Sequence, residues 1–265
     1  MINKILGRLL SSLPENNKLE RIWILAKIDF IERYYGTRMG IIWALINPFF
    51  QLLIYYFVFT LIFVVQIENF ALYVFSGLIF WMFFSESTTK GLTLLSKYKS
   101  ILENIKIKKI DLYYSSLIST FMSLSFNFLI YILFSLFFNI HYSWNVLYVP
   151  FLLLNLGILI LGIQLLLGAI YIYLRDINHL WDMALLLLFW ASPLFYSKDL
   201  IIAKLPILFY LNPLAGIFVN LRETLLYANS PDFQQLFYDL IFSSILLIIA
   251  GIVFKKYSVK SVEIL

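Results

Sequence analysis

The chain has 265 residues, of which 62% are hydrophobic and only 13% are charged, and its mean hydropathy is +0.88. About a quarter of the residues in a soluble domain are charged, so this composition excludes an ordinary soluble fold and indicates an integral membrane protein. The apolar runs are long and continuous, which favours membrane-spanning helices over the alternating strands of a barrel. The absence of cysteine excludes disulfides and thiol chemistry.

Residues 1–39 are predicted to form a cytoplasmic segment at the membrane interface. Arg8 interrupts the first apolar stretch, so we expect no signal peptide there. From Lys18 onward an amphipathic helix is predicted, with an apolar face that carries Leu19, Trp23, Ala26, Phe30 and Tyr34. The opposite face carries Lys18, Arg21, Asp29, Glu32 and Arg33. This helix is predicted to lie along the membrane surface, and a small cytoplasmic helix packed on a partner is an equal alternative.

Residues 40–254 are predicted to form a bundle of six membrane spans, because a helix needs about 20 apolar residues to cross a bilayer. The spans are residues 40–65, 70–84, 112–138, 146–174, 183–196 and 233–254. The second is short, and it continues through residues 85–89 if that polar part is packed in protein or faces water. Residues 200–210 and 214–219 are too short to cross and predict a re-entrant helical hairpin between spans five and six.

Basic residues are sorted by this topology, which explains the net charge of +5 without a nucleic-acid partner. They concentrate in the N-terminal segment, in the loop of residues 90–111 and in the tail of residues 255–265. Of the 20 lysines and arginines, only Lys198, Lys204 and Arg222 are assigned to the other side. Positive loops stay in the cytoplasm, so we expect a multi-pass protein of the cytoplasmic membrane with both termini inside.

No catalytic or metal site is predicted, and no cofactor. The ten glycines never form a phosphate-binding loop, so this chain is not expected to bind ATP. Asp176, His179 and Asp182 superficially resemble a metal set, but a solvated or partner-facing loop is the preferred interpretation. We expect no ionisable side chain deep enough within the spans to form a proton or ion relay, which argues against an ion-coupled pump.

A polar and aromatic stripe runs down the first span. Trp43, Asn47, Gln51 and Tyr55 recur every four residues and therefore share one helix face. Such a face avoids lipid and lines either another helix or an aqueous path, and helix packing alone is an equally good interpretation. The chain is also 19% aromatic, which suits stacking on sugar rings as well as anchoring at the membrane interface.

Residues 33–48, RYYGTRMGIIWALINP, resemble the opening of permease subunits of ABC exporters for bacterial surface polysaccharides. Residues 174–177 with 192–196, and residues 212–214 with Arg222, resemble the same family in order and spacing. A proline that family members commonly have near residues 108–111 is absent, which leaves the end of that segment open. The resemblance covers essentially the whole chain and implies an all-α permease that exports lipid-linked O-antigen, capsule or teichoic acid, with O-antigen the first choice.

The resemblance implies a homodimer with two cytoplasmic ATP-binding subunits, which would hold the ATP and magnesium. It also implies that the loop between spans two and three couples to the ATPase, with candidates Lys97, Lys99, Glu103, Lys106, Lys108, Lys109 and Asp111. We expect the pathway to be lined by the first-span stripe and by Trp190, Phe195 and Tyr196 of span five. Arg33 and Arg38 are candidates for the lipid phosphate, because arginine matches phosphate oxygens, and plain membrane anchoring is an equal alternative.

Three other functions stay open at this point. An exporter of drugs or small lipids from the same superfamily would share most of these features. A membrane-bound transferase would need a deep acid, base or nucleotide site, which the sequence does not offer. A structural anchor would leave the basic loop of residues 97–111 unexplained.

Overall fold

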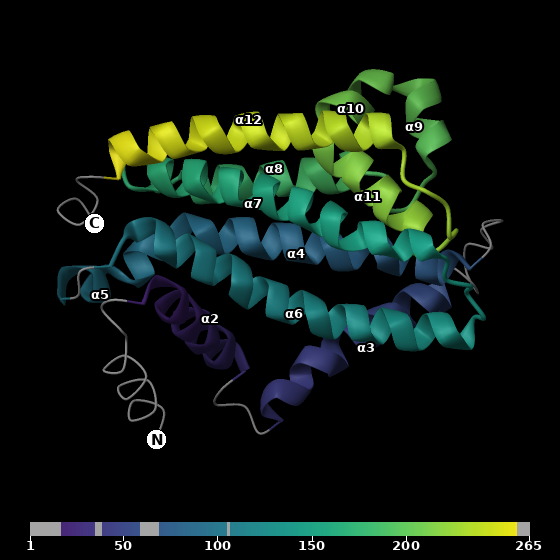
Figure 1. The fold of residues 1–265 in the computed structure, drawn as a ribbon, viewed down its shortest axis with the longest axis horizontal. Coiled ribbons are helices and arrows are strands. Elements are labelled where there is room, and N and C mark those ends of the chain that lie inside the picture. Colours follow the sequence, from purple (N-terminus) through teal and green to yellow (C-terminus); the bar gives the residue numbers. More distant parts are fainter. Residues whose placement is uncertain (1–16, 35–38, 59–68, 105–106, 259–265) are drawn as a thin grey trace.

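The computed structural model describes residues 17–34, 39–58, 69–104 and 107–258, and these ranges are helical without a strand. The first elements are α2 (Lys18–Tyr34), η1 (Gly40–Ile42), α3 (Trp43–Phe57), α4 (Phe70–Lys97), α5 (Lys99–Asn104) and α6 (Lys109–Phe137). They are followed by η3 (Trp144–Tyr148), α7 (Val149–Tyr171), α8 (Ile177–Ala191), α9 (Lys198–Lys204), α10 (Pro206–Leu211), α11 (Pro213–Leu225) and α12 (Phe233–Tyr257). The long helices lie side by side along the longest axis of the molecule (Figure 1).

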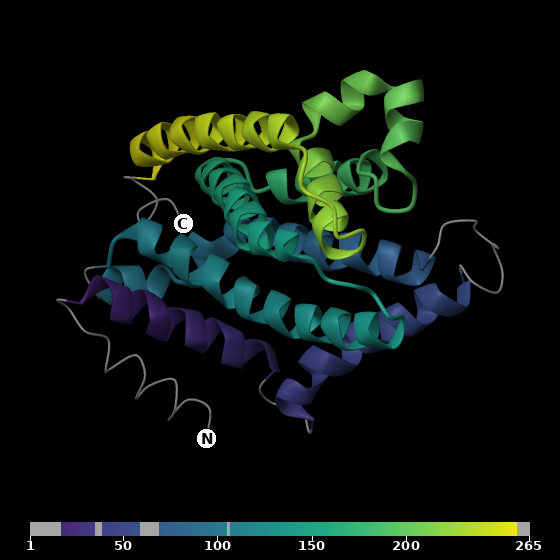
Figure 2. The ribbon, with the colours of Figure 1, turned by 45° about the vertical axis from the view of Figure 1, so that its right-hand side comes forward.

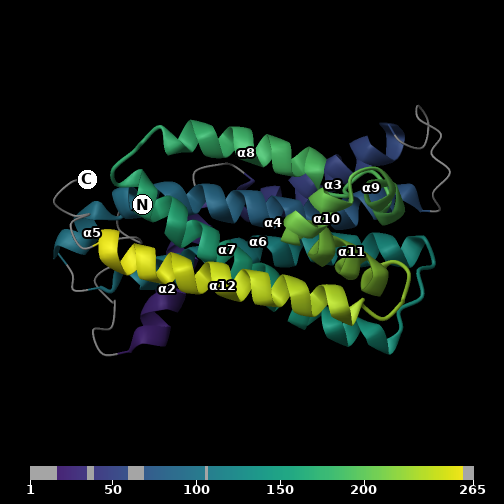
Figure 3. The same cartoon turned by 90° about the horizontal axis from the view of Figure 1, so that it is seen from above.

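Helix α4 is the centre of the bundle. It packs against α3, α6, α7, α8 and α11, and most of its residues are buried. Seen from above, α8 and α12 lie on either side of α4 and α7 (Figure 3). The first part of α4 is apolar on all sides, as expected of a helix surrounded by others. The prediction that this helix continues beyond residue 84 is confirmed, because its polar part is packed in protein.

Side-chain hydrogen bonds hold that polar part of α4. Ser87 donates to Thr120 of α6 at 2.6 Å, and Gln164 of α7 donates to the Ser87 carbonyl oxygen at 2.7 Å. Trp181 of α8 donates its indole N–H to the Thr88 hydroxyl at 3.2 Å. Polar groups buried in this way join the three neighbouring helices to α4.

Four helices in the described part of the chain are long and apolar enough to cross a membrane: Phe70–Lys97, Lys109–Phe137, Trp144–Tyr171 and Phe233–Tyr257. They correspond to predicted spans two, three, four and six. The helices of predicted spans one and five, α3 and α8, are each 15 residues long. The far end of predicted span one lies outside the described residues.

The boundaries of predicted span five need correction. Helix α8 begins at Ile177, within the predicted charged loop, and ends at Ala191. Ser192 is extended, with ψ 143°, because it precedes Pro193 and proline disfavours the helical conformation of the residue before it. Phe195 and Tyr196 therefore lie beyond the helix that was predicted to carry them.

Helices α9, α10 and α11 lie together at one end of the bundle (Figures 1 and 2). The predicted hairpin of two pieces is thus three short helices. Pro213 occupies the first turn of α11, and the Asn212 side chain accepts a hydrogen bond from the Leu214 N–H, which caps the helix. The Arg222 guanidinium is buried, donates to the carbonyl oxygens of Tyr73 and Pro193, and fixes α11 against α4.

The opposite end of the bundle gathers α5, the start of α2 and the end of α12 (Figure 1). Lys109, at the start of α6, donates to the Ser258 carbonyl oxygen just after α12. This arrangement places the start of α2, the predicted coupling loop and the end of α12 at one end, as the topology prediction requires.

Candidate functional site

The side of α2 that faces the bundle carries both charged and apolar residues. Arg21 is buried, and its guanidinium lies 2.8 Å from the carboxylate of Asp111 at the start of α6. The Asp111 side chain has no exposed surface. Leu19 and Trp23, from the predicted apolar face, are 79% and 47% exposed. Ala26 and Phe30 of the same predicted face are buried together with Arg21, so the predicted division into one apolar and one charged face is not how α2 packs. Ion pairs with residues of α4 and α6 neutralise the inward charges. The position of α2 along the membrane surface stays a prediction.

Asp29 connects α2 to the polar end of α4. Its carboxylate lies 3.0 Å from the Lys90 ammonium and 2.9 Å from that of Lys97. Burial alone would raise the pKa of Asp29, but the two lysines outweigh burial and lower that pKa from 3.8 to about 2. Lys97 also lies 2.9 Å from Glu32, one turn further along α2.

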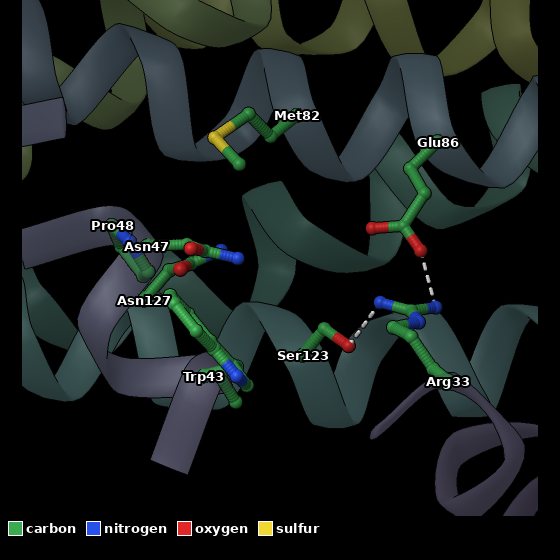
Figure 4. Close-up of a pocket in the computed structure, with 9 residues that line it drawn as sticks. Arg33, Trp43, Asn47, Pro48, Met82, Glu86, Ser123 and Asn127 are labelled. Atoms are coloured by element: carbon green, nitrogen blue, oxygen red, sulfur yellow. Dashed lines mark hydrogen bonds and ion pairs between the residues drawn. The ribbon is translucent and has the colours of Figure 1, made fainter. Parts of the chain in front are cut away.

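A cavity of about 390 Å³ opens where the C-terminal end of α2 meets α3, α4 and α6. Its lining residues are Arg33, Trp43, Ala44, Asn47, Pro48, Met82, Glu86, Ser123 and Asn127. Figure 4 shows Glu86 reaching from α4 toward Arg33, which forms an ion pair with it. Arg33 also donates a hydrogen bond to the Ser123 hydroxyl at 2.6 Å.

The predicted stripe on α3 divides between two places. Trp43 and Asn47 line the cavity (Figure 4), and the half-buried Gln51 lies one turn beyond Asn47. Tyr55 lies further along α3, where its ring contacts Phe195 with centroids 6.4 Å apart. The stripe therefore runs from a polar cavity to an aromatic cluster.

That aromatic cluster contains the predicted residues of span five. The Trp190 and Phe195 rings lie 5.9 Å apart, and the Tyr196 hydroxyl donates to the Trp190 carbonyl oxygen at 2.7 Å. Trp190 is 62% exposed. The structure thus brings residues of α3 together with the segment after α8, as a common pathway would require.

The predicted coupling residues fall into two groups. Lys97 and Asp111 hold α2 in place, and Lys109 holds the end of α12. Lys99 and Glu103 on α5, 3.9 Å apart, and Lys108 before α6 lie on the surface of that end. Lys106 lies outside the described residues, as does the phosphate candidate Arg38.

Ionisable residues on two helices, α8 and α12, bear on the sequence predictions. Asp176, His179 and Asp182 are exposed around the start of α8, and no group of three or more potential metal ligands occurs among the described residues. Asp239 lies within α12 with no exposed surface, and Gln235 donates to its carboxyl group at 3.0 Å. The expectation that no deep ionisable group lies within the spans therefore fails in α12.

Sequence reasoning missed four residues of the site: Glu86, Lys90, Ser123 and Asn127. One signal was available, because Glu86 and Lys90 are four residues apart in the polar part of a helix whose first half is apolar, and ionisable groups in such helices usually have a function. Ser123 and Asn127 are separated by one turn of α6 and carried no comparable signal.

The cavity combines two partly exposed charged groups with amides, a hydroxyl and an indole ring. Such groups bind anions and hydroxyl-rich ligands through hydrogen bonds and stacking. Among the described residues that line it, none forms a pair of nucleophile and base of the kind that covalent catalysis requires. The cavity therefore offers hydrogen-bond donors and acceptors, a ring face and charges of both signs.

Known proteins resemble this chain over most of its length. The family model described as ABC-2 type transporter matches residues 20–226. Two proteins of Klebsiella pneumoniae, both named O-antigen export system permease protein RfbA, are 28% identical over 251 and 250 residues, covering 91% of this chain and 93% of each protein. A protein of the same name from Myxococcus xanthus is 24% identical over 234 residues, covering 88% of this chain and 90% of that protein.

Proposed function

We propose, from the premise that this chain belongs to the ABC-2 type transporter family, that it exports lipid-linked polysaccharide across the cytoplasmic membrane. Membership confirms the resemblance drawn from residues 33–48, and it makes the chain the membrane subunit of an ABC exporter. The relatives named as O-antigen export permeases cover nearly the whole chain, which supports O-antigen as the polysaccharide.

The observation that carries the proposal is the cavity between α2, α3, α4 and α6. A lipid-linked glycan has an anionic phosphate end next to its sugars. Arg33 offers the guanidinium that suits phosphate oxygens, while Asn47 and Asn127 offer amides and Trp43 a ring face to the sugars. The stripe on α3 continues from there to the aromatic cluster around Phe195.

Two copies of the chain would enclose the pathway. None of the side chains of α8 is buried within one chain, and Leu180, Met183, Leu187 and Trp190 are exposed along it at spacings of three and four residues. This apolar face is available to a second copy. We expect a homodimer in the cytoplasmic membrane with six spans per subunit, a re-entrant group formed by α9 to α11, and both termini in the cytoplasm.

A separate ATP-binding subunit would drive the cycle, with two copies per homodimer. Helix α5 would receive it, since Lys99, Glu103 and Lys108 are accessible at the end of the bundle that is predicted to be cytoplasmic. ATP and magnesium would then be bound by that subunit.

The second candidate is export of another substrate: capsule, teichoic acid, a drug or a small lipid. The same cavity would accept the diphosphate of another lipid-linked glycan, and so cavity chemistry does not separate these substrates. The aromatic cluster around Trp190 favours sugars over small apolar drugs.

Deletion of the gene in its own host tests the function. Loss of long surface glycan, detected by electrophoresis of extracted lipopolysaccharide and restored by the intact gene, is the expected result. The purified chain should hydrolyse ATP only when combined with its ATP-binding subunit. Unchanged surface glycan in the deletion strain, or ATP hydrolysis by the chain alone, would contradict the proposal.

A further inference from the structure

We propose that Glu86 is a built-in competitor of the substrate: its carboxylate occupies the cationic part of the cavity until a diphosphate displaces it. This inference rests on the proposed function, because it concerns the anionic end of the lipid-linked glycan. It goes further in assigning an autoinhibitory role to one side chain.

The contacts of Glu86 are those that a phosphate group would make. Its carboxylate pairs with Arg33 and lies 3.5 Å from the Lys90 ammonium. Arg33 donates in addition to the Ser123 hydroxyl, so the guanidinium lies between two oxygen-bearing side chains (Figure 4). Arginine and lysine side chains bind carboxylate and phosphate oxygens with the same donors, so the two anions compete for them.

Among the described residues, the ion-pair cluster that includes Arg33 has no net charge only because Glu86 is present. The cations are Arg33, Lys90 and Lys97, and the anions are Asp29, Glu32 and Glu86, all joined by ion pairs of the described residues. A cluster with no net charge attracts an incoming anion weakly. Withdrawal of the Glu86 carboxylate leaves one unit of positive charge beside the cavity, which strengthens the attraction for a diphosphate.

The position of Glu86 suits a group that moves. The side chains of Arg33 and Glu86 are 21% and 35% exposed, and ion pairs open to water contribute little to stability. The Arg21–Asp111 pair, with side chains 10% and 0% exposed, is costly to break. Helix α2 therefore stays attached to α6 near its start, while the pair at its other end can exchange partners.

The test compares the binding of three probes to the full chain, held with its ATP-binding subunit in lipid nanodiscs without nucleotide. The probes are farnesyl diphosphate, farnesyl monophosphate and farnesol. Glu86→Gln keeps the shape of the side chain and removes its charge, so we expect it to bind farnesyl diphosphate about tenfold more tightly. The gain should be smaller for the monophosphate and absent for farnesol.

Matched variants separate this effect from a general change of charge. Glu20→Gln makes the same change at the exposed start of α2 and should leave affinity unaltered. Arg33→Gln should weaken binding of the diphosphate and remove most of the gain from Glu86→Gln. Glu86→Asp keeps the charge but shortens the side chain by one methylene group. Its affinity for the diphosphate should lie between those of the unchanged chain and Glu86→Gln, and it replaces Glu86→Gln as the test if that variant folds poorly.

Affinity for farnesyl diphosphate that is equal or lower in Glu86→Gln, or a gain as large in Glu20→Gln, would overturn the inference. The same holds if no variant binds the diphosphate. These failures differ from failure of the proposed function, which is judged by loss of surface glycan in the deletion strain. If glycan is lost but Glu86→Gln gains no affinity, the export function stands and the role of Glu86 does not.

Discussion

Replacement of Asp111 by asparagine is the sharpest test of the attachment of α2. Asp111 has no exposed surface. One of its carboxylate oxygens lies 2.8 Å from the Arg21 guanidinium, and the other lies 3.6 Å from the Lys18 ammonium. Asparagine keeps the size of the side chain but removes the charge. Arg21, itself buried, would then lack the carboxylate that compensates its charge.

The expected loss follows from burial. Removing one partner of a buried ion pair costs about 3–5 kcal/mol, because the remaining charge is left uncompensated in a region of low polarity. Lys18 is 52% exposed and keeps its hydration when the carboxylate is lost, so it adds little. We expect Asp111→Asn to lower the free energy of unfolding by about 3 kcal/mol, at the lower end of that range.

Thermal and denaturant unfolding of the detergent-solubilised chain, followed by tryptophan fluorescence, measures this loss. Glu103→Gln on α5 serves as the control, since exposed pairs contribute about 0–1 kcal/mol. Arg21→Met combined with Asp111→Asn should recover at least about 1 kcal/mol of the loss, which gives the coupling between the two residues. An Asp111→Asn variant as stable as the control would refute the packing of α2 described above.

Three further predictions use other parts of the fold. A Cβ at Gly168 would lie 1.9 Å from the Tyr113 hydroxyl oxygen, so Gly168→Ala should lower the free energy of unfolding by about 1–3 kcal/mol. Adding Tyr113→Phe should recover part of this loss. A Gly168→Ala variant with unaltered stability would contradict the close packing of α4, α6 and α7. The stabilisation from ionised Asp29 is complete above its unfolded pKa of 3.8 and is lost as pH falls toward about 2. The free energy of unfolding, measured against pH, should therefore fall by about 2 kcal/mol across that interval. The Asp29→Asn variant should not show this fall. Because the chain has no native cysteine, single cysteines at Glu103 and Asn229 should react with an impermeant thiol reagent from opposite faces of the membrane, and labelling of both from one face would contradict the topology.

The apolar runs were sufficient to predict the helices because a membrane imposes its thickness on sequence. A lipid-exposed backbone must satisfy its own hydrogen bonds, so a long apolar run has no alternative to helix. A proline predicted the break at Asn212 before Pro213. Pro193 carried the same signal, but span five was predicted to run through it to residue 196, whereas the helix ends at Ala191. The length of α4 could not be fixed in this way, since its polar part is stable only with Thr120 and Gln164 beside it.

The orientation of α2 could not be predicted from its own pattern. Amphipathic periodicity separates two faces but does not say which of them meets protein. The buried charges of α2 are compensated by distant residues: Lys90 is 61 positions from Asp29, and Asp111 is 90 positions from Arg21. Spacing within one helix carries no information about partners at that distance.

The same pairing changes the meaning of the basic loops. Sequence reasoning counted Arg33, Lys90 and Lys97 as positive charge that fixes topology, and Arg222 as a charge of the opposite side. In the structure the first three are paired with carboxylates of the same chain, and Arg222 is buried against backbone oxygens. These three cations beside the cavity are therefore already neutralised within the described part of the chain. An anionic substrate would enter by exchanging partners with a carboxylate already in place, which makes recognition depend on Glu86 as much as on the arginine.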